Sequence, residues 1–159
     1  FNTYGPRQSQ RAIIPTIISQ FLGGTGIVKV GATSPTRDFS HVLDTCSGFI
    51  AAAQGDASNC VGKTFNLGSN FEISIAELIE IVAEIIGVDC EVQTDQQRLR
   101  PVDSEVERLF AETSKAKEML GWKPRFGGRE GFQRGLSSTI DWFKDPENLA
   151  GYKVGQYSL

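Results

Sequence analysis

Apolar residues recur every three or four positions in four stretches of the chain, the spacing of one face of an α-helix. These stretches cover residues 14–22, 42–53, 75–86 and 132–143. The third gives the clearest prediction, because Ser74 and Glu77 have the spacing of a capping box and Gly87 follows the last apolar residue. A shorter helix is predicted over residues 113–120, where Thr113 can cap the start and Gly121 follows the end.

Shorter apolar segments between these helices predict β-strands at residues 1–4, 27–30, 63–67 and 90–94, and an extended piece at 35–40. The run Gly-Gly-Thr-Gly at residues 23–26 has the composition of a phosphate loop. Phosphate loops follow a strand and open a helix, whereas this run follows a helix and precedes a strand, so we predict a turn. Because strands and helices alternate, the predicted class is α/β.

Composition and length favour one folded unit. Of the 159 residues, 40% are apolar and 22% charged, which is typical of a globular chain and not of a disordered one. Residues 1–145 carry all the periodic segments and form the predicted domain. Residues 146–159 show no periodicity and are predicted to form a tail.

Charge and cysteine content narrow the function classes. A net charge of −3 argues against a general nucleic-acid or membrane-binding surface. The three cysteines, Cys46, Cys60 and Cys90, lack the close spacing of a metal or redox site, so we predict reduced and mostly buried thiols and no metal centre. No apolar stretch approaches the ~20 residues needed to cross a bilayer, and no signal peptide opens the chain, so a cytoplasmic location is predicted.

Five motifs occur in one order along residues 1–142: FNTYGPRQSQRAIIPTII, PTRDFSHVLDT, KTFNLGS, LRPVDSEVER and TSKAKEMLGWKP. Together they resemble the C-terminal half of the extended short-chain dehydrogenases that act on nucleotide sugars. The sub-group they are most similar to is the NAD-dependent nucleoside-diphosphate-sugar 4,6-dehydratases and epimerases. The resemblance implies the late strands of a Rossmann-type sheet together with a helix-rich nucleotide-sugar-binding subdomain.

A nucleoside-diphosphate sugar presents two phosphates, which suit arginine forks, and a hydroxyl-rich hexose, which suits amides. The resemblance implies that Asn2 contacts the substrate and that Arg37 and Arg100 bind the diphosphate. It also places Asn66 near the nucleotide, and Arg11 and residues 14–16 in the wall of the pocket. Each residue also has a structural interpretation. Asn2 could be an ordinary residue of an edge strand, and Arg37 or Arg100 could form a solvated salt bridge, which contributes ~0–1 kcal/mol of stability.

Other polar residues are assigned structural roles. Arg98 and Arg108 are predicted to be surface charges, and Asp103 is predicted to orient its own loop. His41, the single histidine, and Asp44 are predicted to be structural, with Asp44 capping free amides.

The chain lacks the residues that carry the chemistry of the resembled family. Those enzymes bind NAD through a glycine-rich turn between the first strand and helix, and neither G-x-x-G-x-x-G nor G-x-G-x-x-G occurs here. Their base is the tyrosine of a Tyr-x-x-x-Lys pair, yet Tyr4, Tyr152 and Tyr157 have no lysine four positions later. We therefore expect no catalytic residue, no bound NAD and no hydride transfer from this chain alone, and we expect a missing upstream half.

Three functional hypotheses remain open. In the first, the chain is the substrate-binding region of a dehydratase or epimerase and binds a nucleoside-diphosphate sugar. In the second, it is a non-enzymatic protein that forms a homo-oligomer or pairs with a Rossmann-half partner through open strands and apolar helix faces. In the third, it is an unrelated small α/β domain whose motif matches are accidental.

Overall fold

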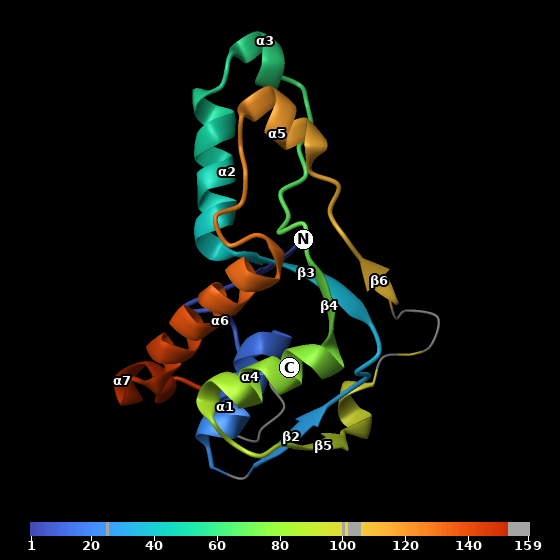
Figure 1. Cartoon of the computed structure of the whole chain (residues 1–159), viewed down its shortest axis with the longest axis vertical. Helices are drawn as coiled ribbons and strands as arrows, with labels where there is room; N and C mark the ends of the chain where they lie inside the picture. The colour runs from blue at the N-terminus through green and yellow to red at the C-terminus, as the bar shows by residue number, and fades with distance from the viewer. Residues whose placement is uncertain (25, 100, 102–105, 153–159) are drawn as a thin grey trace.

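The computed structural model describes residues 1–24, 26–99, 101 and 106–152. Its helices and strands follow one another in the order β1 (Asn2–Tyr4), α1 (Ile13–Leu22), β2 (Ile27–Val30), β3 (Thr36–His41), α2 (Val42–Gln54), α3 (Ala57–Cys60), β4 (Glu72–Ser74), α4 (Ile75–Ile86), β5 (Glu91–Thr94), η1 (Gln96–Arg98), β6 (Arg108–Leu109), α5 (Ser114–Leu120), α6 (Gly128–Lys144) and α7 (Pro146–Leu149). Helices α2, α3 and α5 form a narrow upper lobe, and the remaining helices surround the sheets in a broader lower part (Figure 1).

Strand β3 is the centre of the larger sheet. It pairs with β1 in parallel, with β4 antiparallel and with β6 in parallel. The register places Asn2 opposite Phe39. Because side chains two apart on a strand share a face, Asn2, Phe39 and Arg37 lie on the same side of this sheet.

The second sheet consists of β2 and β5, which pair in parallel from Ile27 opposite Glu91 to Val30 opposite Thr94. Helix α1 packs against β2 and also against α4 and α6. The Gln20 side chain supports this arrangement, since its amide accepts a hydrogen bond from the backbone N–H of Lys29 at 2.8 Å and donates one to the carbonyl oxygen of Lys29 at 3.2 Å.

The main core lies where α1, α4 and α6 face the larger sheet. Its fully buried members come from the predicted apolar faces: Ile14, Ile17, Ile18, Leu78, Ile79, Val82, Phe132, Leu136, Ile140 and Phe143. Tyr4 enters this core from β1, with its ring edge toward Phe132 at a centroid distance of 5.4 Å. Gly135 on α6 makes room for it, because a Cβ there would collide with the Tyr4 hydroxyl oxygen.

Most of the predicted elements are confirmed. The Ser74–Glu77 capping box is present in both directions, and Gly87 ends α4 in the left-handed conformation at φ 81°. Gly121 ends α5 in the same way at φ 63°. Thr113 precedes α5 as predicted, but its hydroxyl bonds the side-chain oxygen of Asn70 at 2.6 Å and does not cap the helix. Residues 23–26 connect α1 to β2, which agrees with the predicted turn.

The predicted strand at residues 63–67 is wrong. No strand pairing involves this segment among the described residues, although it joins α3 to β4. A strand needs a neighbour to complete its backbone hydrogen bonds, and the apolar pattern of the segment carries no information on whether one is there. The polar stretch at residues 96–108 contains η1 and β6, while Arg100 and Asp103 lie outside the described residues.

The prediction of mostly buried thiols is also wrong. Cys46 and Cys90 are exposed, and Cys60 is partly exposed. The reason for Cys46 is the orientation of α2, which turns Asp44 and Gly48 inward and its larger apolar side chains outward. A Cβ at Gly48 would collide with the Leu67 side chain, so a larger residue there would require Leu67 to shift.

Residues 146–152, assigned to a tail from the sequence, contain α7 and the Tyr152 side chain. Tyr152 packs against Phe143 at a ring-centroid distance of 4.7 Å and against Trp142 at 6.2 Å. These contacts attach the end of the described chain to α6. The division into a domain at residues 1–145 and a tail stays a prediction.

Candidate functional site

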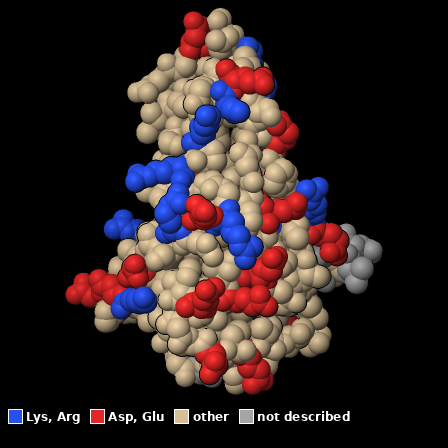
Figure 2. All heavy atoms as spheres, in the orientation of Figure 1, with Lys and Arg blue, Asp and Glu red and all other residues tan. Residues whose placement is uncertain are grey.

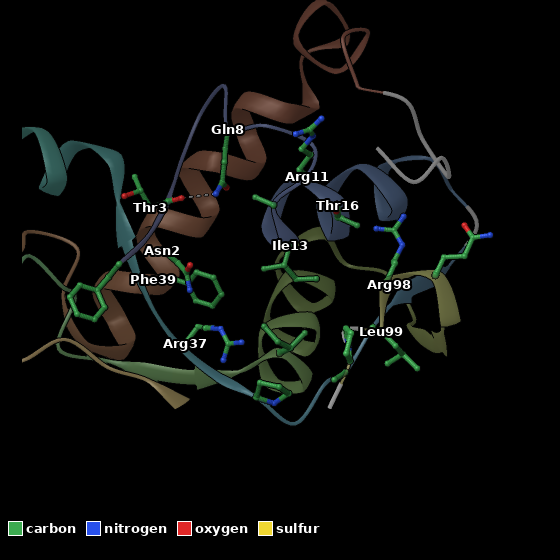
Figure 3. Close-up of a pocket in the computed structure, with 18 residues that line it drawn as sticks. Asn2, Thr3, Gln8, Arg11, Ile13, Thr16, Arg37, Phe39, Arg98 and Leu99 are labelled. Carbon is green, nitrogen blue, oxygen red and sulfur yellow. Dashed lines mark hydrogen bonds between the residues drawn. The ribbon is translucent and has the colours of Figure 1, made fainter. Parts of the chain in front are cut away.

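A cavity of about 630 Å³ opens beside β1, α1, β3 and η1 (Figure 3). Its described lining is Phe1, Asn2, Thr3, Gln8, Arg11, Ala12, Ile13, Thr16, Gly31, Ala32, Pro35, Arg37, Phe39, Ile75, Gln97, Arg98, Leu99 and Pro101. Asn2, Phe39 and Arg37 stand on one side, Arg98 and Leu99 on the other, and α1 lies between them (Figure 3).

Strands β1 and β3 of the larger sheet carry Asn2 and Arg37 to the cavity. Both side chains are half-buried. The guanidinium of Arg37 donates a hydrogen bond to the carbonyl oxygen of Thr36 at 2.8 Å. Sheet register therefore places an amide and a guanidinium on the same wall, as the sequence hypothesis required of a substrate-binding pair.

Arg11 and Arg98 reach the cavity from the segment before α1 and from η1. Arg98 donates from Nε to Asp95 Oδ2 at 3.0 Å, and its side chain is only 14% exposed. The prediction that Arg98 is a surface charge is therefore wrong, because the 3₁₀ turn folds it inward, a geometry that a polar stretch of sequence does not reveal. The same prediction for Arg108 is confirmed, since Arg108 is exposed and paired with Glu72.

The charge of the cavity differs from that of the chain. Three arginines and no Asp or Glu belong to its described lining, although the whole chain has a net charge of −3. On the face drawn in Figure 2, acidic side chains predominate at the foot of the molecule, and most lysines and arginines lie higher up. A wall of guanidinium groups without a lining carboxylate suits an anionic ligand, and bidentate donors suit phosphate in particular.

The segment that joins β1 to α1 forms one wall and is held at several points. Its turn places Arg7 in the left-handed region at φ 67°. The side-chain amide of Gln8 donates to the carbonyl oxygen of Thr3 at 2.6 Å, and the hydroxyl of Thr16 donates to the carbonyl oxygen of Gln10 at 2.9 Å. These bonds fix the wall before any ligand arrives.

The opposite wall is held by a close backbone approach. The N–H of Asp95 donates to the carbonyl oxygen of Val30 at 2.8 Å, which ties the start of η1 to the end of β2. Gly31 lies directly under η1, and a Cβ there would collide with the carbonyl oxygen of Arg98. Any larger residue at position 31 would therefore require a shift of the backbone at Gly31 or at Arg98.

The other predicted site residues are not brought to this cavity. Asn66 is exposed and lines a second recess of about 240 Å³, with Phe1, Thr3, Thr45, Phe49, Phe65 and Leu67. Arg100 lies outside the described residues. The structure thus groups Asn2, Arg11 and Arg37 with Thr16, which belongs to the stretch expected in the pocket wall, whereas Ile14 and Pro15 do not line the cavity. It adds Arg98, which was predicted to be a surface charge, and Gln8, which the sequence did not single out.

His41 and Asp44 have structural roles, as predicted. His41 is 3% exposed and caps α2, since its Nδ1 accepts a hydrogen bond from the N–H of Leu43 at 3.3 Å. Burial lowers the pKa of His41, and the negative charge of nearby Asp44 partly opposes this shift. The Asp44 carboxylate accepts from the backbone N–H groups of Arg125 at 2.8 Å and Phe126 at 2.9 Å. It therefore caps a distant turn and not its own helix.

Asp38, next to Arg37, was missed as a structural residue. Its carboxylate is fully buried and accepts hydrogen bonds from the N–H and hydroxyl of Ser69, both at 2.7 Å, and from the N–H of Ala111 at 3.3 Å. The signal was present in the sequence, because an aspartate in a buried strand requires partners of this kind. Asp38 joins β3 to the segments before β4 and before α5.

Neither a glycine turn between a strand and a helix nor a cluster of metal-ligating side chains occurs among the described residues. Closely spaced glycines occur among the described residues after α1, at positions 23, 24 and 26, and at the start of α6, at Gly127, Gly128 and Gly131. Neither run directly follows a strand. In the same part of the chain, no three His, Cys, Asp or Glu side chains gather in a way that suits a metal ion. Among the helices described, none has the length and apolar character needed to cross a membrane.

Comparison with known proteins identifies the family. The family model described as GDP-mannose 4,6 dehydratase matches residues 1–135. The dTDP-glucose 4,6-dehydratase of Xanthomonas campestris is 28% identical over 173 residues, which cover 99% of this chain and 45% of that protein. UDP-glucuronic acid decarboxylase 6 of Arabidopsis thaliana is 33% identical over 138 residues, covering 82% of this chain and 36% of that protein.

A solved structure shows the same fold. The UDP-glucuronic acid 4-epimerase of Bacillus cereus, in complex with UDP-glucuronic acid and NAD, superposes with a TM-score of 0.77 at 28% identity, over 91% of this chain and 43% of that chain. The chain thus spans less than half the length of the relatives that it matches. Its α/β fold is a partial Rossmann-type fold, and the chain belongs to the GDP-mannose 4,6-dehydratase family of nucleoside-diphosphate-sugar dehydratases and epimerases, within the extended short-chain dehydrogenases.

Proposed function

We propose that this chain is the substrate-binding region of a nucleoside-diphosphate-sugar dehydratase or epimerase and that it binds the diphosphate in the cavity between β3 and η1. The observation that carries the proposal is the cavity lining, in which the described residues include three arginines and no acidic side chain. A diphosphate carries the charge and the acceptor oxygens that such a lining matches.

In this proposal, residues on different walls of the cavity bind different parts of the substrate. Arg37 and Arg98, on opposite walls, bind the phosphates, and Arg11 approaches from the segment before α1. Asn2, on the strand that pairs with the strand of Arg37, donates and accepts hydrogen bonds with hexose hydroxyls. The contribution of the chain is positioning, since a ligand held in one geometry reacts without a further loss of rotational freedom. Arg100 and Asn66 remain expected substrate contacts on the strength of their motifs.

The same proposal assigns hydride transfer and NAD binding to residues outside this chain. It is supported by the lack of a Tyr-x-x-x-Lys pair and of a dinucleotide-binding glycine turn in the sequence, and by the fraction of the relatives that the chain covers. The chain alone should therefore bind substrate at most. The cytoplasmic location expected from the sequence belongs to this proposal.

A second candidate is a protein that acts by binding a partner or by forming oligomers. The observation in its favour is the outward apolar face of α2, where Phe49 is 70% exposed and Ile50 56%. The two candidates are compatible, because no residue of α2 belongs to the lining of the cavity.

Calorimetric titration with UDP, dTDP and GDP, each free and as a hexose conjugate, tests the first candidate. We expect saturable binding to one nucleotide that weakens roughly tenfold in Arg37→Ala, because a charged hydrogen bond is worth ~1.5–3 kcal/mol. Arg129→Ala is the matched control, since Arg129 is exposed at the start of α6 and does not line the cavity. Unchanged binding in a double Arg37→Ala, Arg100→Ala variant would refute the proposed site.

A further inference from the structure

The two-stranded sheet of β2 and β5 is closed along its β2 edge. There the side-chain amide of Gln20 accepts a hydrogen bond from the N–H of Lys29 at 2.8 Å and donates one to the carbonyl oxygen of Lys29 at 3.2 Å. A neighbouring strand would make the same two kinds of bond with Lys29. Helix α1, which carries Gln20, therefore supplies a substitute for a third strand on this side of the sheet.

The β5 edge has no such substitute among the described residues. The N–H groups of Glu91 and Asp95 donate to carbonyl oxygens at the two ends of β2, at 2.9 and 2.8 Å. Because successive residues of a strand turn their backbone groups to opposite sides, Val92 and Thr94 direct theirs away from β2. No hydrogen bond joins these groups to any residue that the structure describes. Val92 and Thr94 are exposed, and β5 lies at the lower margin of the molecule in Figure 1.

The apolar core is also incomplete at this edge. Val92 is in register with Val28, so the two side chains point to the same face of the sheet. Val28 is fully buried, whereas Val92 is 46% exposed. One further strand beside β5 would cover Val92 in the way that the elements around β2 cover Val28.

The charge around β5 has one sign. Every charged residue between positions 64 and 97 is an aspartate or a glutamate, and Asp89 and Glu91, at the start of β5, are exposed. Carboxylates on two neighbouring strands repel each other, while a carboxylate and a lysine attract. A second copy of this chain would bring its own acidic β5 to the edge, so the charge favours a cationic partner.

We propose that the open edge of β5 binds an extended, cationic segment of a partner protein, which adds to the sheet as a third strand. The backbone groups of Val92 and Thr94 then exchange hydrogen bonds with the added strand, as in peptide recognition by strand addition. Alternate side chains of that strand contact Val92 on one face and the carboxylates of Asp89 and Glu91 on the other.

Amide hydrogen exchange, measured by NMR, tests this proposal with a synthetic peptide of alternating lysine and valine, acetylated and amidated at its ends. We expect exchange at Val92 and Thr94 to slow at least about tenfold at saturating peptide, since a bonded amide exchanges only when the added strand detaches. The Lys29 amide is the internal control, because Gln20 already holds it and its rate should not change.

Two matched peptides separate strand addition from other kinds of binding. A peptide with glutamate in place of lysine, and a lysine–valine peptide with N-methyl groups on alternate amides, should both fail to protect Val92 and Thr94. The proposal is overturned if the lysine–valine peptide gives no protection or if either matched peptide protects equally. Protection without peptide that rises with protein concentration would also overturn it, because a second copy would then occupy the edge.

Two kinds of variant locate the binding on β5. Val92→Pro removes the outward N–H and leaves the bonds of Glu91 and Asp95 to β2, so calorimetric affinity for the peptide should fall at least about tenfold. Val92→Thr keeps the N–H and is the control. Combined Asp89→Lys and Glu91→Lys, which changes only exposed side chains, should weaken binding independently of the backbone. Undiminished affinity in folded Val92→Pro or in the charge-reversed variant would refute the proposal. No nucleotide is needed, so this outcome is separate from that of the substrate-binding proposal.

Discussion

The hydroxyl of Tyr152 donates a hydrogen bond of 2.8 Å to the backbone carbonyl oxygen of Gln8, which lies 144 positions earlier in the sequence. Gln8 in turn donates from its side chain to Thr3 and lines the arginine-bordered cavity. The end of the described chain therefore supports a wall of the candidate site from behind.

Tyr152→Phe tests this support. The ring keeps its contacts with Trp142 and Phe143, and only the hydroxyl is lost. We expect the free energy of unfolding to fall by ~0.5–1.5 kcal/mol, the usual net worth of one hydrogen bond, in urea denaturation. Affinity for the nucleotide should fall as well if the wall positions the ligand. Unfolding and binding indistinguishable from the parent chain would show that the Tyr152 hydroxyl supports nothing.

The capping box of α4 gives a second prediction. The Ser74 hydroxyl accepts from the N–H of Glu77 at 3.2 Å, and the Glu77 carboxylate accepts from the N–H of Ser74 at 3.2 Å. Ser74→Ala should cost ~1 kcal/mol of unfolding free energy. Ser114→Ala is the comparison, because Ser114 is the first residue of α5 and does not occupy its N-cap position, which is Thr113, so the substitution should cost less. Equal losses in the two variants would contradict the capping role.

Substitution of Asp38 should lower the free energy of unfolding by more than loss of the capping box does. Its carboxylate is buried with three donors from Ser69 and Ala111, and removal leaves those donors without an acceptor. Asp38→Ala should lower the unfolding free energy by roughly 3 kcal/mol, since each unsatisfied buried group costs ~1–3 kcal/mol. Asp141→Ala, on the exposed side of α6, should change it by less than about 0.5 kcal/mol. A small loss at Asp38 would mean that water replaces the carboxylate.

His41 gives the chain a defined dependence of stability on pH. Burial lowers its pKa in the folded state, so the unfolded state binds the proton more tightly. The corresponding stability is present above the unfolded pKa of about 6.5 and is lost as the pH falls below it. His41 is the single histidine, and the shifted carboxylates of Glu72, Glu77 and Glu112 have lowered pKa values that lie further down the scale.

Urea denaturation between pH 7.5 and 5.5 measures this dependence. The parent chain should lose stability toward pH 5.5, with a slope no steeper than ~1.4 kcal/mol per pH unit for one proton. His41→Asn, which retains a side chain able to cap α2, should flatten the slope. A slope that survives the substitution would assign the titration to another group.

The predictable part of the fold is the part that local patterns determine. Periodicity located α1, α4 and α6, and the Ser74–Glu77 and Gly87 signals fixed both ends of α4, because propensity, capping and burial agree there. The strand at residues 63–67 and the burial of Cys46 failed for a different reason. Both depend on contacts with segments distant in the sequence: a strand needs a pairing partner, and burial of Cys46 needs a neighbour that covers its side of α2. A local pattern of apolar residues gives no information on such contacts.

The residues of the candidate site also fall into those that the sequence could locate and those that it could not. Asn2 and Arg37 belong to motifs on paired strands, so sheet register brings them together. Arg98 joins them through a 3₁₀ turn that no periodic pattern announces. Asn66 occupies a recognisable motif as well, yet the fold directs it to the recess beside α2 and not to the cavity.

A crystal structure of the chain with its bound nucleotide sugar tests the central claim most directly. The account predicts the diphosphate in the cavity between β3 and η1, with phosphate oxygens at hydrogen-bond distance, ~2.7–3.2 Å, from the guanidinium groups of Arg37 and Arg98. A nucleotide in the recess beside Asn66, or a cavity that stays empty at saturating nucleotide sugar, would contradict it.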